Sequence, residues 1–350
     1  MLKLLHGADF HLDSPFAGLT PEAAQARRRL QRRLPLELAA LCKRENCDLV
    51  LLAGDLFDSG RVTPESVEAL QQGLEESAVP VFIAPGNHDY FSPLSPWQQF
   101  PWPGNVHIFS GAWSSFPLPD ISVRIWGAAF QSPHEEAALG SVQREYPLEL
   151  GVLHGDPVYG SAFRPADIAA SGLNYLALGH IHKTQMPLRA GKTWYGWPGV
   201  AMGRGFDETG VHGVFSVTLT EDGDCAAELL PLPGPKYYER SAAAGDDPVA
   251  AAWAALAEVS QEDVVRLTLT GESPGVDLSQ IRAALQGRCG SLLLVDETVP
   301  PQALWDEAGT GSLRGMALSQ LREAFAAGDP DAAEAAKYLL AALEGRDAPW

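Results

Sequence analysis

The chain contains few cysteines and no long apolar run. Its four cysteines, in 350 residues, fit neither a disulfide framework nor a paired CxxC zinc site. They are Cys42, Cys47, Cys225 and Cys289. The amino-terminal segment MLKLLHGADF holds one lysine and a short apolar run broken by histidine and aspartate, so it resembles neither a signal peptide nor a membrane span. We therefore expect a cytoplasmic protein of a reducing compartment, with no membrane association.

Basic residues are also scarce. Lysine and arginine number 25 against 44 aspartates and glutamates, which gives a net charge of −19, and residues 239–350 contain 18 acidic and 8 basic residues. This balance argues against a surface that holds nucleic acid by bulk electrostatics, since such affinity comes from neutralising phosphates. It does not exclude a nuclease, because metal ions and a basic partner supply positive charge locally. The densest basic run, Arg27 to Arg29 with Arg32 and Arg33, is interpreted as the solvated face of a helix.

The chain has a hydrophobic content of 46% and a charged content of 20%, values typical of a globular protein. Three apolar runs that end in polar residues follow one another, at residues 2–9, 48–54 and 81–84. Helical patterns separate them, at residues 22–44 with a kink expected at Pro35, and at residues 64–78. This order predicts an α/β protein whose β-α-β-α-β unit forms a parallel sheet, with a site along the carboxyl edge of the sheet.

Shorter strand patterns follow residue 89. They lie at residues 106–109, 121–126, 150–154, 175–178, 192–196 and 213–219. Many are joined by too few residues for a crossover helix, so we expect a second, mostly antiparallel sheet packed on the first.

The last third of the chain reads as a separate small domain. The run PLPGP at residues 231–235 is typical of a linker. Beyond it, a β-α-β pattern is expected, with strands at 264–270 and 291–295 and a helix at 278–285, followed by a helical tail at 312–343 that is broken at 328–330. The predicted domains are residues 1–232, 236–300 and 301–350.

Five short segments bear side chains that can ligate metal, and each follows an apolar run. They are Asp9-Phe10-His11, Gly54-Asp55-Leu56-Phe57-Asp58, Gly86-Asn87-His88-Asp89, His154-Gly155-Asp156 and Gly179-His180-Ile181-His182. Oxygen and imidazole ligands of this kind bind manganese, iron or zinc. At strand spacing, Asp-x-His and His-x-His each place both side chains on one face, so we expect each pair to face one cleft. A carboxylate between them can bridge two cations that activate a water and clamp a phosphate.

The order of these motifs resembles that of the calcineurin-like metallophosphoesterase superfamily, over residues 1 to about 220. Within it, the stretches HGADFHLDSPF, LLAGDLFDSG, PGNHD, YLALGHIHK and YGWPGVAMGRGFDETG resemble the bacterial DNA repair exonucleases of the SbcD type, particularly their YhaO-like branch. This resemblance implies a four-layer α-β-β-α metallophosphoesterase sandwich with a small C-terminal α+β cap domain and a helical tail.

The resemblance also implies a role for each motif residue. One metal would be held by Asp9, His11 and His182, the other by Asn87, His154 and His180, and Asp55 would bridge both. His88 would stand beside the scissile phosphate without binding metal. Related nucleases usually carry histidine where this chain has Asp58, and we expect Asp58 to accept a hydrogen bond from His88 and fix its tautomer. Arg204 and Tyr195, in the stretch after the fifth motif, are expected to contact substrate.

The leading hypothesis is a two-metal phosphodiesterase that acts on DNA in repair, by attack of a metal-bridging hydroxide on the phosphodiester. Mn²⁺ is the expected metal, with iron and zinc as alternatives. A phosphatase or a nucleotide or cyclic-nucleotide phosphodiesterase on the same fold remains an alternative, and a non-catalytic scaffold is a third. The resemblance implies that the tail docks a coiled-coil ATPase of the SbcC type, and a homodimer is a further expectation.

Overall fold

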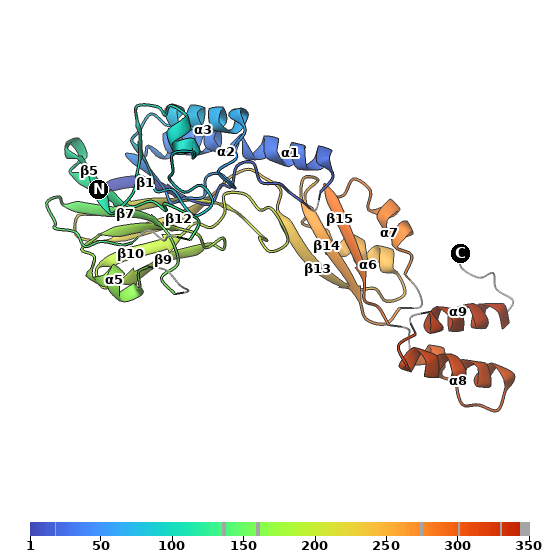
Figure 1. Ribbon diagram of the computed structural model, residues 1–350. Helices are drawn as coiled ribbons and strands as arrows, with labels where there is room; N and C mark the ends of the chain where they lie inside the picture. Colours follow the sequence, from blue (N-terminus) through green and yellow to red (C-terminus); the bar gives the residue numbers. More distant parts are fainter. Residues whose placement is uncertain are drawn as a thin grey trace. The chain divides into compact units, whose positions relative to one another are not determined.

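The computed structural model describes residues 1–17, 19–134, 138–158, 162–273, 276–299, 302–329 and 331–343. It divides into two compact units, Met1–Lys236 and Tyr237–Trp350. Each unit has hydrophobic clusters of its own, and each is described by itself below (Figure 1).

The first unit begins with a mixed six-stranded sheet in the order β12-β11-β1-β2-β3-β4. Its strands are β1 (Leu2–Gly7), β2 (Leu49–Leu52), β3 (Val81–Ile83), β4 (Val106–Ile108), β11 (Gly213–Leu219) and β12 (Cys225–Pro231). Strands β1 to β4 are parallel, and β11 and β12 are antiparallel to their neighbours. The predicted parallel β-α-β-α-β unit is therefore confirmed.

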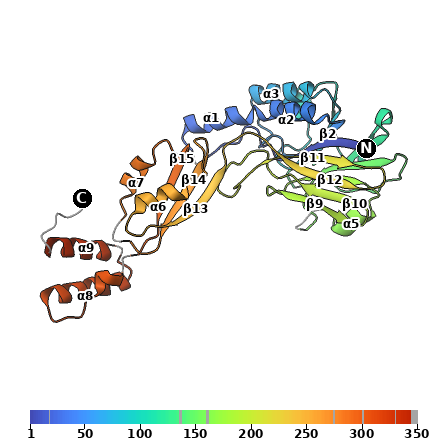
Figure 2. The ribbon, with the colours of Figure 1, turned by 180° about the vertical axis from the view of Figure 1, so that it is seen from behind.

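Helices α2 (Leu34–Glu45) and α3 (Pro64–Glu76) cover one face of this sheet, as Figures 1 and 2 show from opposite sides. Helix α1 (Pro21–Gln31) precedes them in the chain, and the short α4 (Pro96–Gln99) follows β3. The single kinked helix expected at residues 22–44 is wrong, because α1 ends at Gln31 and α2 begins at Leu34. Pro35 thus lies in the first turn of α2, where its missing N–H costs no helical hydrogen bond.

The second sheet has the strand order β5-β6-β7-β8-β10-β9. Its strands are β5 (Ser114–Leu118), β6 (Val123–Gly127), β7 (Leu148–His154), β8 (Tyr175–Gly179), β9 (Gln185–Ala190) and β10 (Thr193–Trp197), with η1 (Pro119–Ile121) and α5 (Pro165–Ala170) between strands. The four central strands are parallel and only the two edge strands are antiparallel. The expectation of a mostly antiparallel sheet is wrong, because the connections before β7 and β8 are long enough for crossovers.

Two of the strands expected in the second sheet, β4 and β11, belong to the first. The two sheets pack face to face. Alternate residues of a strand point to opposite sides, so one strand of the first sheet contacts both the helices and the second sheet. Val50 and Leu52 of β2 pack with the helices, whereas Leu49 and Leu51 pack with residues of β6, β7 and β8. Helix α5 packs through Ile168 on the outer face of the second sheet.

The second unit contains a three-stranded parallel sheet in the order β13-β14-β15. Its elements are β13 (Tyr237–Ala243), α6 (Pro248–Ala255), β14 (Val264–Thr270), α7 (Leu278–Ala284), β15 (Ser291–Asp296), η2 (Gln302–Trp305), α8 (Leu313–Ala326) and α9 (Ala332–Leu343). The first of these strands, β13, was not expected from the sequence. No helix within the described ranges is both long and apolar enough to cross a membrane.

Candidate metal centre

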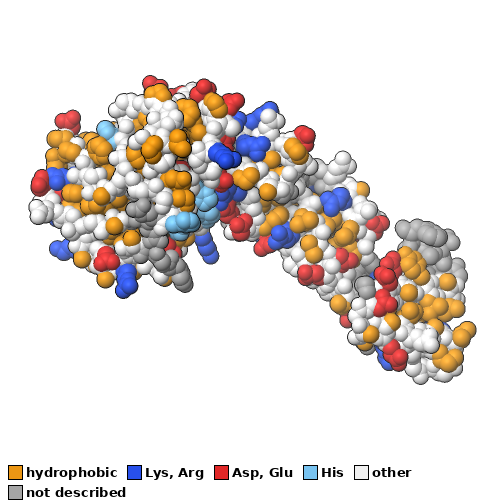
Figure 3. Space-filling view, viewed as in Figure 1, with side chains coloured by type: hydrophobic (Ala, Val, Ile, Leu, Met, Phe, Trp, Pro, Cys, Tyr) orange, Lys and Arg blue, Asp and Glu red, His pale blue; other side chains and the backbone are white. Residues whose placement is uncertain are grey.

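The five motifs meet at the carboxyl ends of β1, β2, β3, β7 and β8, where open α/β sheets bind ligands. Backbone hydrogen bonds join the first two loops, from Asp9 N to Gly54 O at 3.0 Å and from His11 N to Asp55 O at 2.9 Å. His180 N donates to both carboxylate oxygens of Asp9 at 3.1 Å, which ties in the fifth loop. Figure 3 shows histidine side chains gathered at one place on the surface, with lysine and arginine side chains beside them.

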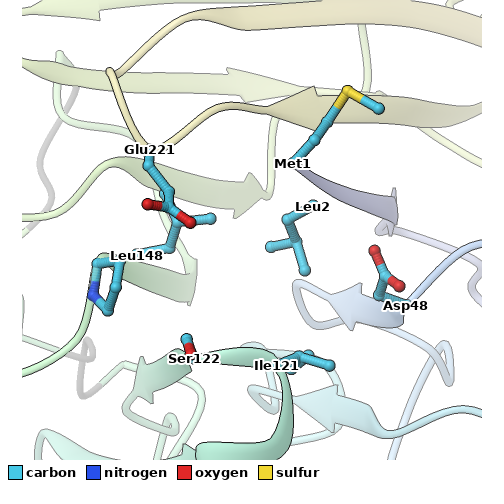
Figure 4. Close-up of a pocket in the computed structure, with 8 residues that line it drawn as sticks. Met1, Leu2, Asp48, Ile121, Ser122, Leu148 and Glu221 are labelled. Carbon is cyan, nitrogen blue, oxygen red and sulfur yellow. The ribbon is translucent and has the colours of Figure 1, made fainter.

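The opposite edge of the strands holds a cavity of about 190 Å³, shown in Figure 4. It is lined by Met1, Leu2, Asp48, Ile121, Ser122, Pro147, Leu148 and Glu221. None of these residues is a histidine, lysine or arginine, so the side chains of the cavity include neither an imidazole ligand nor a cation for a phosphate. The carboxyl edge is the candidate site.

Several expected ligands have left-handed backbone conformations rather than strand geometry. The φ angles are 53° at Asp9, 46° at His11, 51° at Asp55 and 94° at His180. Non-glycine residues in this region carry strain of about 1–3 kcal/mol each, and such residues cluster at functional sites. The strand-spacing argument for Asp-x-His and His-x-His is therefore wrong: β1 ends at Gly7 and β8 at Gly179, so the loops, not the strand period, aim these side chains.

Asp9, His11 and His182 form one group whose ligand atoms lie within 4.8 Å of one another. The Nε2 atoms of the two histidines are 3.2 Å apart. His11 Nδ1 lies 3.2 Å from Asp58 Oδ1, and His182 Nδ1 lies 2.8 Å from Glu208 Oε1. His182 Nδ1 also lies 3.2 Å from Arg204 Nη2. With a carboxylate beside each Nδ1, the tautomer that carries its proton on Nδ1 leaves the Nε2 lone pair for a metal ion. Two nitrogens bound to one ion at about 2.1 Å would be about 3.0–3.4 Å apart, so the pair fits a metal ion.

A second group contains Asp9, Asp55 and His154. His154 donates from Nδ1 to Ala53 O at 2.8 Å, which directs its Nε2 towards Asn87 Oδ1 at 3.1 Å and Asp55 Oδ2 at 3.2 Å. The His180 ring lies beside it, with centroids 5.1 Å apart. Two oxygens thus lie at His154 Nε2, and a second imidazole ring lies beside that of His154.

The Asp55 carboxylate belongs to the second group and also lies near the first. Its Oδ2 is 3.2 Å from His154 Nε2 and 3.9 Å from His11 Nε2, and its Oδ1 accepts a hydrogen bond from His88 N at 2.9 Å. A Cβ atom at Gly86 would collide with Asp55 Oδ1, so only glycine allows the two loops to approach this closely. The arrangement suits a carboxylate that bridges two ions.

The electrostatics of the site favour positive charge. Burial raises the pKa of Asp9 to about 7. Burial lowers the pKa of His154, but the neighbouring Asp55 carboxylate outweighs this effect and raises it to about 9. Burial lowers the pKa of His11 to about 4, which keeps that imidazole neutral, as a metal ligand must be. Buried carboxylates with converging lone pairs are the donor set of a cation site, so the residues fit two divalent metal ions.

His88 is exposed and lies next to the first group, with its ring centroid 4.9 Å from that of His11. Its Nδ1 is hydrogen-bonded to the main-chain carbonyl of Asp58 at 2.7 Å. The expected hydrogen bond from His88 to the Asp58 carboxylate does not form. Asp58 Oδ1 instead lies 3.2 Å from His11 Nδ1 and 3.1 Å from Arg204 Nη1. Asp58 therefore orients His88 through its backbone and His11 through its side chain.

The two residues expected to contact substrate, Arg204 and Tyr195, both make contacts within the protein. Arg204 donates to Glu208 from Nη2 at 2.6 Å and to Asp58 from Nη1, so its guanidinium is engaged within the protein. Tyr195 is 8% exposed and packs in an apolar cluster, edge-on to Trp197. Glu208, which was not expected from the sequence, lies beside the expected ligand His182. In the sequence it is marked only by its position four residues after Arg204.

Asp89, the last residue of the third motif, is fully buried and joins two of the loops. Its carboxylate accepts hydrogen bonds from Gly86 N at 2.8 Å, Leu56 N at 2.8 Å and Phe57 N at 3.3 Å. It holds the backbone that presents Asn87 and His88 against the backbone that presents Asp55.

Comparison with known proteins agrees with this geometry. Residues 2–184 match the family of calcineurin-like phosphoesterases, a range that includes all seven expected ligands. The uncharacterized metallophosphoesterase YhaO of Bacillus subtilis (strain 168) is 34% identical over 249 residues, which cover 65% of this chain and 60% of that protein. The DNA double-strand break repair protein Mre11 of Aeropyrum pernix is 26% identical over 227 residues, which cover 57% of this chain and 53% of that protein.

The matched region thus spans between about half and three fifths of the length of these two relatives. Among solved structures, a protein of Thermus thermophilus aligns with 65% of this chain and 98% of its own, at 11% identity and a TM-score of 0.40.

Proposed function

The chain belongs to the calcineurin-like phosphoesterase family, and from this premise we propose that it is a two-metal phosphodiesterase that acts on DNA. The observation that supports the proposal most strongly is the convergence of the strand-end loops on two groups of ligand atoms that share Asp9. Asp55 Oδ2 lies 3.9 Å from His11 Nε2 in one group and 3.2 Å from His154 Nε2 in the other. Metal-dependent phosphoester hydrolysis is the chemistry of the family. The choice of DNA as substrate is the finer step.

Each metal would be held by its own residues. Asp9, His11 and His182 would hold one, Asn87, His154 and His180 the other, with Asp55 shared between them. When bound, divalent cations, which we propose to be Mn²⁺, supply charge neutralisation for the phosphate and acidify a water molecule.

The role proposed for His88 follows from its geometry. Its Nδ1 is held by the Asp58 carbonyl, so the ring has one orientation and its Nε2 is free to act on a substrate. An imidazole in this place can protonate the leaving oxygen or donate a hydrogen bond to the phosphate. Its exposure allows a phosphodiester within a polymer to reach it.

The substrate class rests on the relatives. One relative is named as a DNA double-strand break repair protein, and the stretches that resemble DNA repair exonucleases include the GRGFDE run. We propose that the small parallel sheet is a cap domain. Helices α8 and α9 are the proposed docking element for a coiled-coil ATPase. Because the chain is acidic, a basic partner would supply positive charge that neutralises DNA phosphates.

A substrate panel tests this proposal. Metal-free chain would be supplied with Mn²⁺ and given linear duplex DNA, single-stranded DNA, a generic phosphodiester and a phosphomonoester. We expect hydrolysis of DNA and of the generic diester, dependent on the metal. Rapid hydrolysis of the monoester while DNA remains intact would instead show the phosphatase alternative.

A further inference from the structure

Three charged side chains form a connected network behind the first metal group. Glu208, whose side chain is 3% exposed, accepts from Arg204 at Nη2 and Nε, and Arg204 donates from Nη1 to Asp58. A carboxylate this deeply buried is costly unless it is paired and hydrogen-bonded. Both carboxylates also face a histidine: Glu208 lies 2.8 Å from His182 Nδ1, and Asp58 lies 3.2 Å from His11 Nδ1.

We propose that Glu208 and Asp58, joined by Arg204, are positioning residues that fix His182 and His11 for one of the two metal ions and not for the other. This inference rests on the two-metal site of the proposed function. We call the three residues Asp58, Arg204 and Glu208 the brace.

The brace acts through the tautomers of the two histidines. A carboxylate that accepts the Nδ1 proton leaves the lone pair on Nε2 and holds the ring in one orientation. The two Nε2 atoms lie 3.2 Å apart. Without the carboxylates, either ring could carry its proton on Nε2 and rotate, and the two-nitrogen ligand set would be present only part of the time.

The second metal group is supported differently. His154 donates from Nδ1 to the main-chain carbonyl of Ala53, which no side-chain substitution removes. Within the described residues, neither Asn87 nor His154 forms a hydrogen bond or an ion pair with a member of the brace. The two ions therefore depend on separate supports, and a change in the brace should affect one of them.

Arg204 gives the brace its geometry. Its two terminal nitrogens reach one carboxylate each, Glu208 at 2.6 Å and Asp58 at 3.1 Å, so neither carboxylate is free to turn towards the ions as an extra ligand. The same cation argues against a third metal site among His11, Asp58 and His88, although their ligand atoms lie within 4.8 Å of one another. The guanidinium already supplies the positive charge there.

The test measures metal binding without substrate. Metal-free wild-type chain, Glu208→Gln and Asp58→Asn would be titrated with Mn²⁺, and the free ion would be followed by its electron paramagnetic resonance signal. Two variants at opposite ends of the brace are used so that a folding defect in one does not decide the outcome. Asp207→Asn is the matched control, because it removes the same charge from the neighbouring, exposed position.

We expect the wild type and Asp207→Asn to bind two ions alike. Glu208→Gln and Asp58→Asn should retain one ion at wild-type affinity and bind the other about 10–100-fold more weakly, the usual effect of removing a partner of a ligand. Two ions bound at wild-type affinity in both variants, or equal weakening of both ions, would overturn the brace alone. A wild-type chain that binds fewer than two ions would overturn the proposed function together with it.

Discussion

His6 shows that a histidine three residues from a predicted ligand can belong to the core. Its side chain is fully buried, with Nδ1 2.9 Å from the Tyr175 hydroxyl and Nε2 3.1 Å from Leu178 O. Burial lowers its pKa from 6.5 to about 3. The ring therefore serves as a neutral link between the two sheets, since Tyr175 and Leu178 belong to β8.

This pKa predicts a dependence of stability on pH. The unfolded chain binds a proton at His6 below pH 6.5 and the folded chain does not until about pH 3, so stability falls as the pH falls through this window. Between pH 7.5 and 5.5 the contribution of His6 to the free energy of unfolding should decrease by about 1.4 kcal/mol. Urea unfolding of metal-free wild type and His6→Gln at both pH values measures it. An equal loss in both proteins would contradict a neutral buried His6.

His88 predicts a variant that keeps its metals and loses its activity. His88→Ala should reduce the rate on a phosphodiester by about 10²–10⁴-fold, the usual contribution of a proton-transfer group. Elemental analysis should still find two ions per chain, because His88 is not among the proposed ligands. His134→Ala, which removes another exposed histidine, is the control and should change neither quantity. Loss of metal in His88→Ala would mean that His88 is a ligand.

At the residue scale, the sequence indicated which side chains lie in the site but not the residues with which they form hydrogen bonds and ion pairs. The motifs pointed to Asp9, Asp55 and His154, which do lie together. The direction of the Asp58 carboxylate was missed, because it depends on Arg204, 146 residues away. A contact of that kind has no local pattern. The burial of Tyr195 was not predicted for the same reason, because it depends on packing against residues of other strands.

At the scale of elements, the sequence indicated where strands and helices lie but not how strands pair. Strand periodicity describes one segment, whereas the parallel pairing of β6, β7 and β8 depends on the paths of the long connections between them. The loops after β1 and β8 were missed in a similar way. Their positive φ angles are imposed by neighbouring loops, as the bond from His180 N to Asp9 illustrates.

The contact between α2 and α3 gives a prediction at this scale. Gly73 lies within α3, where alanine would gain about 1 kcal/mol of helix propensity. A Cβ atom there would, however, collide with the backbone and ring of Pro35 in α2. We expect the cost of overpacking to exceed the gain in helix propensity, so that Gly73→Ala lowers the free energy of unfolding, measured in urea, by about 2 kcal/mol. Glu75→Ala, on the exposed side of the same helix, should change it by less than about 0.5 kcal/mol. A stabilised Gly73→Ala would show that the two helices can separate at little cost.

At the scale of the whole molecule, the chain is two units with separate cores. The first unit contains the helix-covered sheet, the second sheet and every proposed ligand, and the second unit has its own clusters around β14 and between α8 and α9. The PLPGP run pointed to a division near this place. Among the described residues, the parallel sheet of the second unit brings together no group of metal ligands, so its fold alone does not indicate a function.

The division predicts the behaviour of a fragment. Residues 1–236 expressed alone should fold, bind two Mn²⁺ ions as the full chain does, and hydrolyse a generic phosphodiester at the same rate. Hydrolysis of duplex DNA should be slower than with the full chain if the second unit contributes to substrate binding. An unfolded fragment would contradict the independence of the first unit, and an unchanged rate on DNA would contradict the role proposed for the second.

We propose that five loops build one centre for two ions around Asp55, and an anomalous difference map from crystals soaked in Mn²⁺ tests this proposal. We expect two peaks about 3.5–4 Å apart, one beside the Nε2 atoms of His11 and His182 and the other beside Asn87 and His154, with the Asp55 carboxylate between them. A single peak, or a peak bound by His88, would contradict it.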